Sequence, residues 1–283
     1  TYGFVREIFP DGGYVDYRFS NFDTPGCQDQ PPANEVGRID GCPLYPKFTS
    51  NALSRGLLTE RITYKSDGYP VLKETYEYAG SDSSSRYKSV SQHRFCGGVI
   101  RFAAYVSEDC CYPALVSKSE IRYMDDGTTI TDTHGYQYDS QRLLSSATVS
   151  RNGESNGECY FYPKDRSGGS YVQMEAAGMY GVPVGRTILR NGKVVKADET
   201  SYMSIPLLAS NNDTLMVPCK VYRDKLTAPP DLSSYNSDPT SYMNPVPDIE
   251  AKVHDEQGNV RFAALRNGSA MEYHWAGRTG RPA

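Results

Sequence analysis

Histidine and cysteine have the widest chemistry of the side chains in this sequence, because both ligate metals and both act in catalysis. The closest histidine–cysteine pair is His93 and Cys96, three residues apart. On a strand this spacing points the two side chains to opposite faces. A zinc site needs three or four protein ligands in tetrahedral geometry, and this pair supplies only two. We therefore expect no metal site and no bound cofactor.

Nucleophilic catalysis needs a base beside the nucleophile. His134 stands next to Asp132 and Thr133 and could act as a base, but we expect it at a strand end with no nucleophile nearby. Cys96 and Cys159 would be nucleophiles only if the fold brought a histidine to them. The sequence has no Gly-x-Ser-x-Gly elbow, no phosphate-binding glycine loop and no His-Glu-x-x-His. We expect no catalytic residue and interpret the four histidines as structural: His93, His134, His254 and His274.

Carboxylate pairs are the other catalytic possibility, since glycoside hydrolysis needs two acids about 5–10 Å apart across a cleft. Five acids are candidates, and the sequence does not choose among them: Glu60, Glu74, Asp125, Asp132 and Glu175. Acids beside turns more often form the turn itself.

Tyrosine is the dominant aromatic residue, with 23 tyrosines against nine phenylalanines and one tryptophan. Most fall on expected strands: Tyr14, Tyr17, Tyr64, Tyr76, Tyr78, Tyr123, Tyr136, Tyr138, Tyr160, Tyr162, Tyr273 and Trp275. Rings exposed in a row on a sheet could stack on sugars. The competing interpretation, which β-propensity favours, is packing within the sheet with the hydroxyls at its rim.

The elements that would position these side chains are hairpins. Eight turn dipeptides sit between alternating apolar and polar residues: Asp11-Gly12, Asp67-Gly68, Asp126-Gly127, Asn152-Gly153, Asn156-Gly157, Asn191-Gly192, Gln257-Gly258 and Asn267-Gly268. Such pairs accept positive φ at both central positions of a type I′ turn, whose twist suits the flanking strands. Each one predicts a hairpin.

The strongest predicted hairpin joins residues 57–64 to residues 71–78. Others join 119–123 to 128–133, 186–189 to 194–196, and the strands near Ile249, 260–265 and 271–275. Helix is expected only over 171–177, ending at Gly178, and in a short turn at 51–55. The pattern predicts an all-β fold: an antiparallel meander of hairpins that forms a curved, twisted sheet or partial shell.

Two stretches resemble the YD-repeat of RHS proteins, in which a Tyr-Asp pair precedes a spacer, a Gly-Arg or Gly-Asn pair and a returning strand. They are residues 136–143, with Tyr138 and Asp139, and residues 253–260, with Asp255, Gly258 and Asn259. The first lacks the glycine. Residues 13–20, residues 160–165 with the Met174 to Val184 stretch, and the closing segment with Tyr273 and Trp275 resemble divergent RHS-like surface proteins of gut anaerobes.

The resemblance implies a large, exported, multi-repeat β-protein whose strands wind into a curved sheet or hollow shell. Some members of the family enclose a C-terminal toxin. It implies no catalytic residue. The matched tyrosines would pack on neighbouring repeats, and the matched aspartates would accept backbone N–H bonds in turns.

Composition excludes several classes of protein. The net charge is -4 and the pI is about 5.6, which argues against nucleic-acid binding. No apolar stretch approaches the roughly 18 residues of a membrane span. Seven cysteines cannot all pair within one chain, which leaves one or two disulfides or buried thiols as alternatives: Cys27, Cys42, Cys96, Cys110, Cys111, Cys159 and Cys219.

We expect a hairpin-rich main domain over 1–227, a proline- and serine-rich linker or long loop over 228–248, and a terminal YD-like hairpin over 249–283. Because the chain opens at Thr1, we expect a processed chain or a segment of a longer one. The predicted function is a non-catalytic structural or interaction segment of a large, exported RHS-like protein that is extracellular or on the cell surface. Its expected partners are the flanking repeats or domains of that protein, and a glycan or protein ligand is left open. The alternative is a carbohydrate-binding module or a glycoside hydrolase that uses exposed tyrosines and a carboxylate pair.

Overall fold

The computed structural model describes residues 2–30, 33–36, 49–79, 86–94, 100–109, 112–206, 214–276 and 281–282. The chain divides into two compact units, Thr1–His134 and Gly135–Ala283. Strand β9 (Thr129–Tyr138) contains the boundary. The expected segments 1–227, 228–248 and 249–283 stay a prediction.

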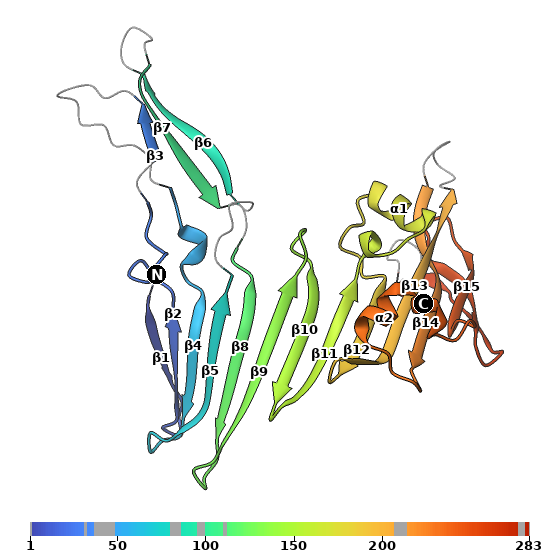
Figure 1. Ribbon diagram of the computed structural model, residues 1–283, viewed down its shortest axis with the longest axis horizontal. Coiled ribbons are helices and arrows are strands. Elements are labelled where there is room, and N and C mark those ends of the chain that lie inside the picture. Colours follow the sequence, from blue (N-terminus) through green and yellow to red (C-terminus); the bar gives the residue numbers. More distant parts are fainter. Residues whose placement is uncertain are drawn as a thin grey trace. The chain divides into compact units, whose positions relative to one another are not determined.

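The first unit is an antiparallel meander with one insertion (Figure 1). Its main strands, in hydrogen-bonded order, are β1 (Phe4–Ile8), β2 (Tyr14–Phe19), β4 (Leu58–Tyr64), β5 (Pro70–Tyr78) and β8 (Leu115–Tyr123), followed by β9. The strands β3 (Ala33–Val36), β7 (Ile100–Asp109) and β6 (Arg86–Arg94) form a separate three-stranded sheet. A 3₁₀ turn, η1, covers Ala52–Ser54. The chain leaves the meander after β5 and returns at β8, which pairs directly with β5.

The second unit continues the same pattern with longer strands. They follow in chain order: β10 (Leu144–Arg151), β11 (Glu154–Phe161), β12 (Gly185–Arg190), β13 (Lys193–Pro206), β14 (Thr214–Lys225), β15 (Ile249–His254), β16 (Val260–Leu265) and β17 (Ala270–Glu272). Strands β18 (Trp275–Ala276) and β19 (Arg281–Pro282) form a separate pair. The short helical elements are η3 (Pro163–Asp165), α1 (Gly169–Ala176), α2 (Leu232–Ser237) and η4 (Pro239–Ser241).

The predicted fold class is confirmed: the chain is all-β, an open antiparallel meander with little helix. Every predicted hairpin except the one at Asn156-Gly157 is found, with β4 against β5, β12 against β13, and β15, β16 and β17 in succession. The predicted helix is α1. Gly178, at φ +76°, ends it with hydrogen bonds from Gly178 N to Glu175 O and from Met179 N to Met174 O, both 2.9 Å, which together make a Schellman motif.

The hairpin turns are of two kinds, and only one is the predicted type I′. Asn152 (φ 51°) with Gly153 (φ 83°), and Asn191 (φ 49°) with Gly192 (φ 78°), have positive φ at both central positions. The flanking residues pair directly across these two-residue loops, Arg151 with Glu154 and Arg190 with Lys193. Here the prediction was right.

The Asp-Gly pairs, Gln257-Gly258 and Asn267-Gly268 form a different turn, so the type I′ prediction was wrong for them. Gly68 has φ +85°, whereas Asp67 is not among the described residues with positive φ. Lys65 N donates to Tyr69 O at 2.9 Å and Gly68 N to Lys65 O at 3.0 Å. This is a three-residue loop, a type I turn followed by a bulge, and it needs positive φ at one position only. Asn156-Gly157 is no turn at all, because both residues lie inside β11.

Fully buried apolar side chains are concentrated in the second unit. One cluster joins Val194, Ala197, Leu226 and Tyr235, and another joins Met174, Val184 and Met216. The helices α1 and α2 pack on β13 in this unit (Figure 1). Tyr235, from the proline-rich 228–248 segment, is completely buried.

The first unit is built differently. Among its described residues, the buried hydrophobic side chains are Val15 and Cys27, whereas Glu74 and Asp132 are also buried. No described helix packs on its main sheet beyond the single turn η1. Within the described residues the main sheet therefore has a single layer, which is held by backbone hydrogen bonds between strands and by side-chain pairs along its faces.

Candidate functional site

The two YD-like turns share one hydrogen-bond pattern. Asp139 Oδ1 accepts from Gln141 N at 2.8 Å and from Leu143 N at 2.9 Å. Asp255 Oδ1 accepts from Gln257 N and Asn259 N, both at 2.9 Å. Each aspartate therefore caps its own turn through two backbone N–H groups, as the resemblance implied. That these turns belong to a larger repeat array stays a prediction.

The missing glycine of the first YD-like turn does not change its geometry. Arg142 takes the position of Gly258 and adopts φ 64°, one of three positive φ values among described residues other than glycine. Arg142 N donates to Asp139 O at 2.9 Å, and Gly258 N to Asp255 O at 3.0 Å. Gly258 has a further constraint, because a Cβ there would lie 2.3 Å from Leu215 Cδ2.

Both capping carboxylates are held in the ionised form. Burial opposes ionisation of Asp139, but the Leu143 N–H and the Lys164 ammonium outweigh it and lower the pKa of Asp139. The Lys164 Nζ–Asp139 Oδ2 distance is 3.1 Å. At the second turn, the Asn259 amide donates to Asp255 Oδ2 at 3.0 Å and lowers the pKa of Asp255.

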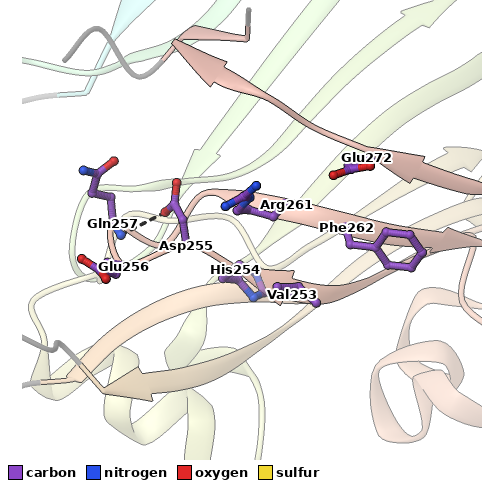
Figure 2. Close-up of a pocket in the computed structure, with 8 residues that line it drawn as sticks. All are labelled: Val253, His254, Asp255, Glu256, Gln257, Arg261, Phe262 and Glu272. Atoms are coloured by element: carbon purple, nitrogen blue, oxygen red, sulfur yellow. Dashed lines mark hydrogen bonds between the residues drawn. The ribbon is translucent and has the colours of Figure 1, made fainter. Parts of the chain in front are cut away.

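A surface hollow of about 650 Å³ lies beside the second YD-like turn (Figure 2). Val253 and His254 come from β15, Arg261 and Phe262 from β16, and Glu272 from β17. Figure 2 shows Asp255 turned back onto Gln257 N, so the carboxylate closes the turn. The acids and the exposed apolar side chains that line the hollow are spread over an open surface and do not point to a common centre.

The aromatic residues of the predicted site have different surroundings. Tyr273 and Trp275 stack with ring centroids 6.2 Å apart. Trp275 Nε1 donates to Val260 O at 2.7 Å, which ties the closing segment to β16. Tyr138 is exposed at the end of β9. The structure therefore brings Tyr273 and Trp275 together and leaves Tyr138 apart from them.

A buried ion pair in the second unit is the site that sequence reasoning missed. Arg166, which follows η3, and Glu199, on β13, form a two-point contact in which Arg166 Nε is 3.3 Å from Glu199 Oε2 and Arg166 Nη2 contacts Glu199 Oε1. Their side chains are 11% and 12% exposed. Tyr235 Oη donates to Glu199 Oε1 at 3.2 Å. Burial raises the pKa of Glu199 despite the nearby guanidinium, and burial likewise raises the pKa of Tyr235.

Local packing explains how these groups are positioned. The Arg166 guanidinium lies over the Phe161 ring, 4.0 Å from its centroid. Gly185 pairs with Glu199 across β12 and β13, and a Cβ on Gly185 would lie 2.5 Å from Glu199 Oε2. The missing side chain makes room for the carboxylate. No local sequence signal could have found this pair, because its members are 33 residues apart.

A pocket of about 490 Å³ opens beside this ion pair. It is lined by Glu199 and Ser201 of β13, Tyr222 of β14 and Tyr171 of α1. The remaining lining comes from Arg166, Ser167, Pro239, Met243, Asn244 and Pro245. Its volume falls within the usual range of small-ligand sites, about 300–1,000 Å³.

In the first unit, charged side chains form a ladder across the sheet. Glu74 on β5 receives Arg61 Nη1 from β4 at 3.1 Å and Lys118 Nζ from β8 at 2.6 Å. Lys118 also contacts Glu120 at 3.2 Å, and Arg122 contacts Glu120. Ion pairs between side chains on neighbouring strands stabilise the register of those strands.

Four of the five candidate acids, all in the first unit, contact basic side chains. Glu60 receives Arg18 at 2.9 Å and Lys73 at 2.8 Å. Glu74 belongs to the ladder, Asp125 pairs with Lys65, and Asp132 lies 3.6 Å from Arg122. Glu175 lies on α1, in the other unit. None of the five lines the 650 Å³ hollow or the 490 Å³ pocket.

The histidines and cysteines are dispersed. His134 lies inside β9, so its expected place at a strand end was wrong. His254 Nε2 is 3.1 Å from Pro218 O. Cys27, Cys159 and Cys219 are free thiols, and burial raises the pKa of Cys27 and Cys159, which disfavours the thiolate. His93 lies on β6, whereas Cys42, Cys96, Cys110 and Cys111 lie outside the described residues.

The tyrosines pack chiefly within the sheet. Of the twelve strand aromatics, Tyr162 is buried, Tyr138 is exposed and the others are half-buried. Tyr14 and Tyr64 stack across β2 and β4 with centroids 4.6 Å apart. Hydroxyls of Tyr78 and Tyr162 donate to the carbonyls of Leu58 and Leu144 at 3.0 and 2.9 Å. These contacts fit packing with hydroxyls at the rim.

Metal-ligand clusters and membrane-spanning helices are both absent from the described residues. No cluster of three or more His, Cys, Asp or Glu side chains is arranged to hold a metal ion. Of the helices in this part of the chain, none has the length and apolar character needed to cross a bilayer.

Distant structural similarity is found among solved structures. No protein-family model matches the chain, and no curated protein matches it. A chain in the crystal structure of TcdB2-TccC3-TEV superposes with a TM-score of 0.42 and 10% sequence identity. The alignment covers 99% of this chain and 19% of that one, so the chain spans about a fifth of the neighbour's length. Similarity at this level assigns neither a family nor a function.

Proposed function

We propose that the chain is a non-catalytic structural and interaction segment of a larger, exported, RHS-like β-protein, in which flanking repeats extend its sheet. The observation that carries this proposal is the edge strand β1. All five of its residues are exposed, and among the described residues it pairs with β2 only. Phe4, Val5 and Ile8 are 49%, 41% and 69% exposed. An exposed apolar edge of this kind is a template for a further strand.

The hydrogen-bond register defines what β1 offers. Phe19 N donates to Gly3 O at 3.0 Å, and Phe9 N donates to Gly13 O at 2.8 Å. In an antiparallel pair such bonded positions alternate with positions whose N–H and C=O point away. Phe4, Arg6 and Ile8 therefore present their backbone groups to the open edge, where a neighbouring strand would bind.

The use of charge in the first unit supports a structural role. Glu74, which is buried, contacts Arg61 and Lys118 from the strands on either side. These side chains join strands and are not gathered around a cleft. In the proposed role, other parts of the longer protein would cover the faces of this sheet.

Hydrogen–deuterium exchange of the peptide that contains β1 tests the proposal. In the isolated 283-residue chain, the amides of Phe4, Arg6 and Ile8 should exchange rapidly. In the longer protein that contains the chain, the same amides should be strongly protected, because a further strand accepts and donates the free bonds. The β12–β13 hairpin, which is already paired on both sides, serves as the internal control.

Two results would contradict this role. One is equally fast exchange of β1 in the isolated chain and in the longer protein. The other is a gene that encodes no β-hairpins next to this chain.

A further inference from the structure

We infer that the 490 Å³ pocket beside Arg166 and Glu199 binds one neutral saccharide unit. This goes beyond the proposed scaffold role, since the pocket lies in the second unit and shares no residue with β1. All its lining residues come from that unit: from the segment between η3 and α1, from α1, from β13 and β14, and from the segment that contains η4.

Charge is the first reason for a neutral ligand. Arg166 and Glu199 are the charged residues that line the pocket, and they contact each other at two points. Their charges therefore compensate within the protein. A charged ligand would be desolvated in the pocket without an uncompensated counter-charge to receive it, which is costly.

Unused polar groups are the second reason. Within the described part of the chain, the hydroxyls of Tyr171 and Tyr222 have no hydrogen-bond partner, and neither does that of Ser201. Each hydroxyl can donate one bond and accept two. The Asn244 side-chain oxygen accepts from Val246 N at 2.9 Å, which leaves its amide N–H₂ free to donate. A ligand with several neutral hydroxyls would satisfy these groups.

The apolar lining is the third reason. The Tyr171 and Tyr222 rings, Met243, Pro239 and Pro245 supply carbon surface around the same space. A pyranose has an apolar face of C–H groups and a rim of hydroxyls, so it matches a lining that combines aromatic rings with neutral donors. An apolar ligand would leave the hydroxyls without partners, at a cost in affinity.

Two of the lining side chains are also held in place by their neighbours. Glu199 is held by Arg166 and by Tyr235, whose ring is fully buried in the cluster with Val194 and Ala197. Tyr171 packs against the cluster of Met174, Val184 and Met216. Groups fixed in this way lose little conformational entropy when a ligand binds, which favours affinity.

Titration of the intact chain with neutral methyl glycosides tests the inference, with saturation-transfer NMR for detection and calorimetry for Kd. The panel contains methyl glucoside, galactoside, mannoside and N-acetylglucosaminide, with glucuronate and glucosamine as charged counterparts. At least one neutral glycoside should bind. Tyr171→Phe and Tyr222→Phe should each weaken it by about 2- to 10-fold, the effect of losing one hydrogen bond.

Two further variants sharpen the test. Ser201→Phe replaces a small lining side chain with a large ring and should abolish binding. Tyr180→Phe is the matched control, because Tyr180 is 48% exposed in the same unit and does not line the pocket. If Ser201→Phe fails to fold, as judged by circular dichroism, the two pocket Tyr→Phe variants decide the outcome.

The inference is overturned if no neutral glycoside binds or if the charged saccharides bind more tightly. It is equally overturned if both pocket Tyr→Phe variants bind as tightly as Tyr180→Phe. Amide exchange of β1 is unaffected by all of these variants, so a failure here is distinguishable from a failure of the scaffold role.

Discussion

The fourth residue of each bulged turn has positive φ, so its side chain determines the backbone strain of the turn. Six described turns share two backbone hydrogen bonds. The N–H of the first residue donates to the carbonyl of the fifth, and the N–H of the fourth donates to the carbonyl of the first. Five of these turns have glycine at the fourth position, Gly12, Gly68, Gly127, Gly258 and Gly268, and Arg142 stands there in the sixth. A non-glycine residue pays about 1–2 kcal/mol for the left-handed conformation. The Asp139 cap evidently compensates this cost in the fold.

Exchanging the residue types at this position gives opposite changes in stability. Gly258→Ala should lower the free energy of unfolding by about 1–3 kcal/mol, because it adds both left-handed strain and a contact with Leu215. Arg142→Gly should raise it by about 0.5–1 kcal/mol, the strain relieved less the entropy of a new glycine. The Arg142 side chain is exposed, so its own contacts contribute little.

Urea unfolding measures both variants, with the midpoint and the slope reported for each. Equal slopes ensure that the midpoints compare stabilities. A shift of both midpoints in the same direction would show that φ at this position does not control the stability of these turns.

At the scale of the element, the main sheet of the first unit replaces a second layer with pairing along its strands. Arg61, Glu74 and Lys118 come from three consecutive strands of the sheet, β4, β5 and β8. Glu74 is 6% exposed at the side chain, whereas Arg61 is 39% and Lys118 is 20% exposed. A carboxylate shared by two cations in this way links β8 to the hairpin that precedes it, across the insertion that carries β3, β6 and β7.

Removal of the shared carboxylate should destabilise the first unit. Glu74→Gln leaves Arg61 and Lys118 without their common partner, and we expect a loss of about 1–2 kcal/mol, less than for a fully buried pair because both cations reach solvent. Asp125→Asn is the matched control. Asp125 also pairs with one cation in this unit, Lys65, but its side chain is 85% exposed.

The control substitution should change stability by less than about 0.5 kcal/mol, since exposed ion pairs contribute little. Circular dichroism in urea measures both variants, at low and at high salt. Equal effects of the two substitutions would mean that the ladder adds nothing beyond ordinary surface pairing.

At the scale of the whole molecule, buried apolar side chains are distributed unequally. Of those among the described residues, Val15 and Cys27 lie in the first unit and the other eleven lie in the second. Burial of apolar surface is the main source of folding free energy. The stability of the first unit therefore comes more from backbone hydrogen bonds between strands and from ion pairs. The stability of the second unit comes more from the apolar clusters around Tyr235 and Met174.

This inequality predicts unfolding in two steps, with the first unit unfolding at lower urea. Trp275 is the single tryptophan and lies in the second unit. Its fluorescence should therefore change at higher urea than the circular dichroism signal begins to change, because circular dichroism reports the strands of both units. Coincident transitions from the two probes would indicate one cooperative unit and contradict the prediction.

The sequence by itself determined the local structure: the hairpins, the two Asn-Gly type I′ turns, α1 and its end at Gly178. These features depend on residues at most a few positions apart, through φ preferences and short-range hydrogen bonds. The same reasoning gave the wrong turn type for Asp-Gly. An Asp-Gly pair fits a type I turn followed by a glycine with positive φ as well as it fits a type I′ turn with two positive φ values. Asn156-Gly157 lies within a strand because pairing with β10 and β12 outweighs its turn preference.

Only the tertiary structure decided which distant groups meet. Arg166 reaches Glu199 because β11 and β13 flank β12, with Gly185 leaving the space. Tyr235, in a segment rich in proline and serine, is buried because its ring fits the cluster on β13. β5 pairs with β8 across the insertion. Such contacts depend on the free energy of whole packed surfaces. The residues that are close in sequence to one member of a contact therefore do not indicate its partner.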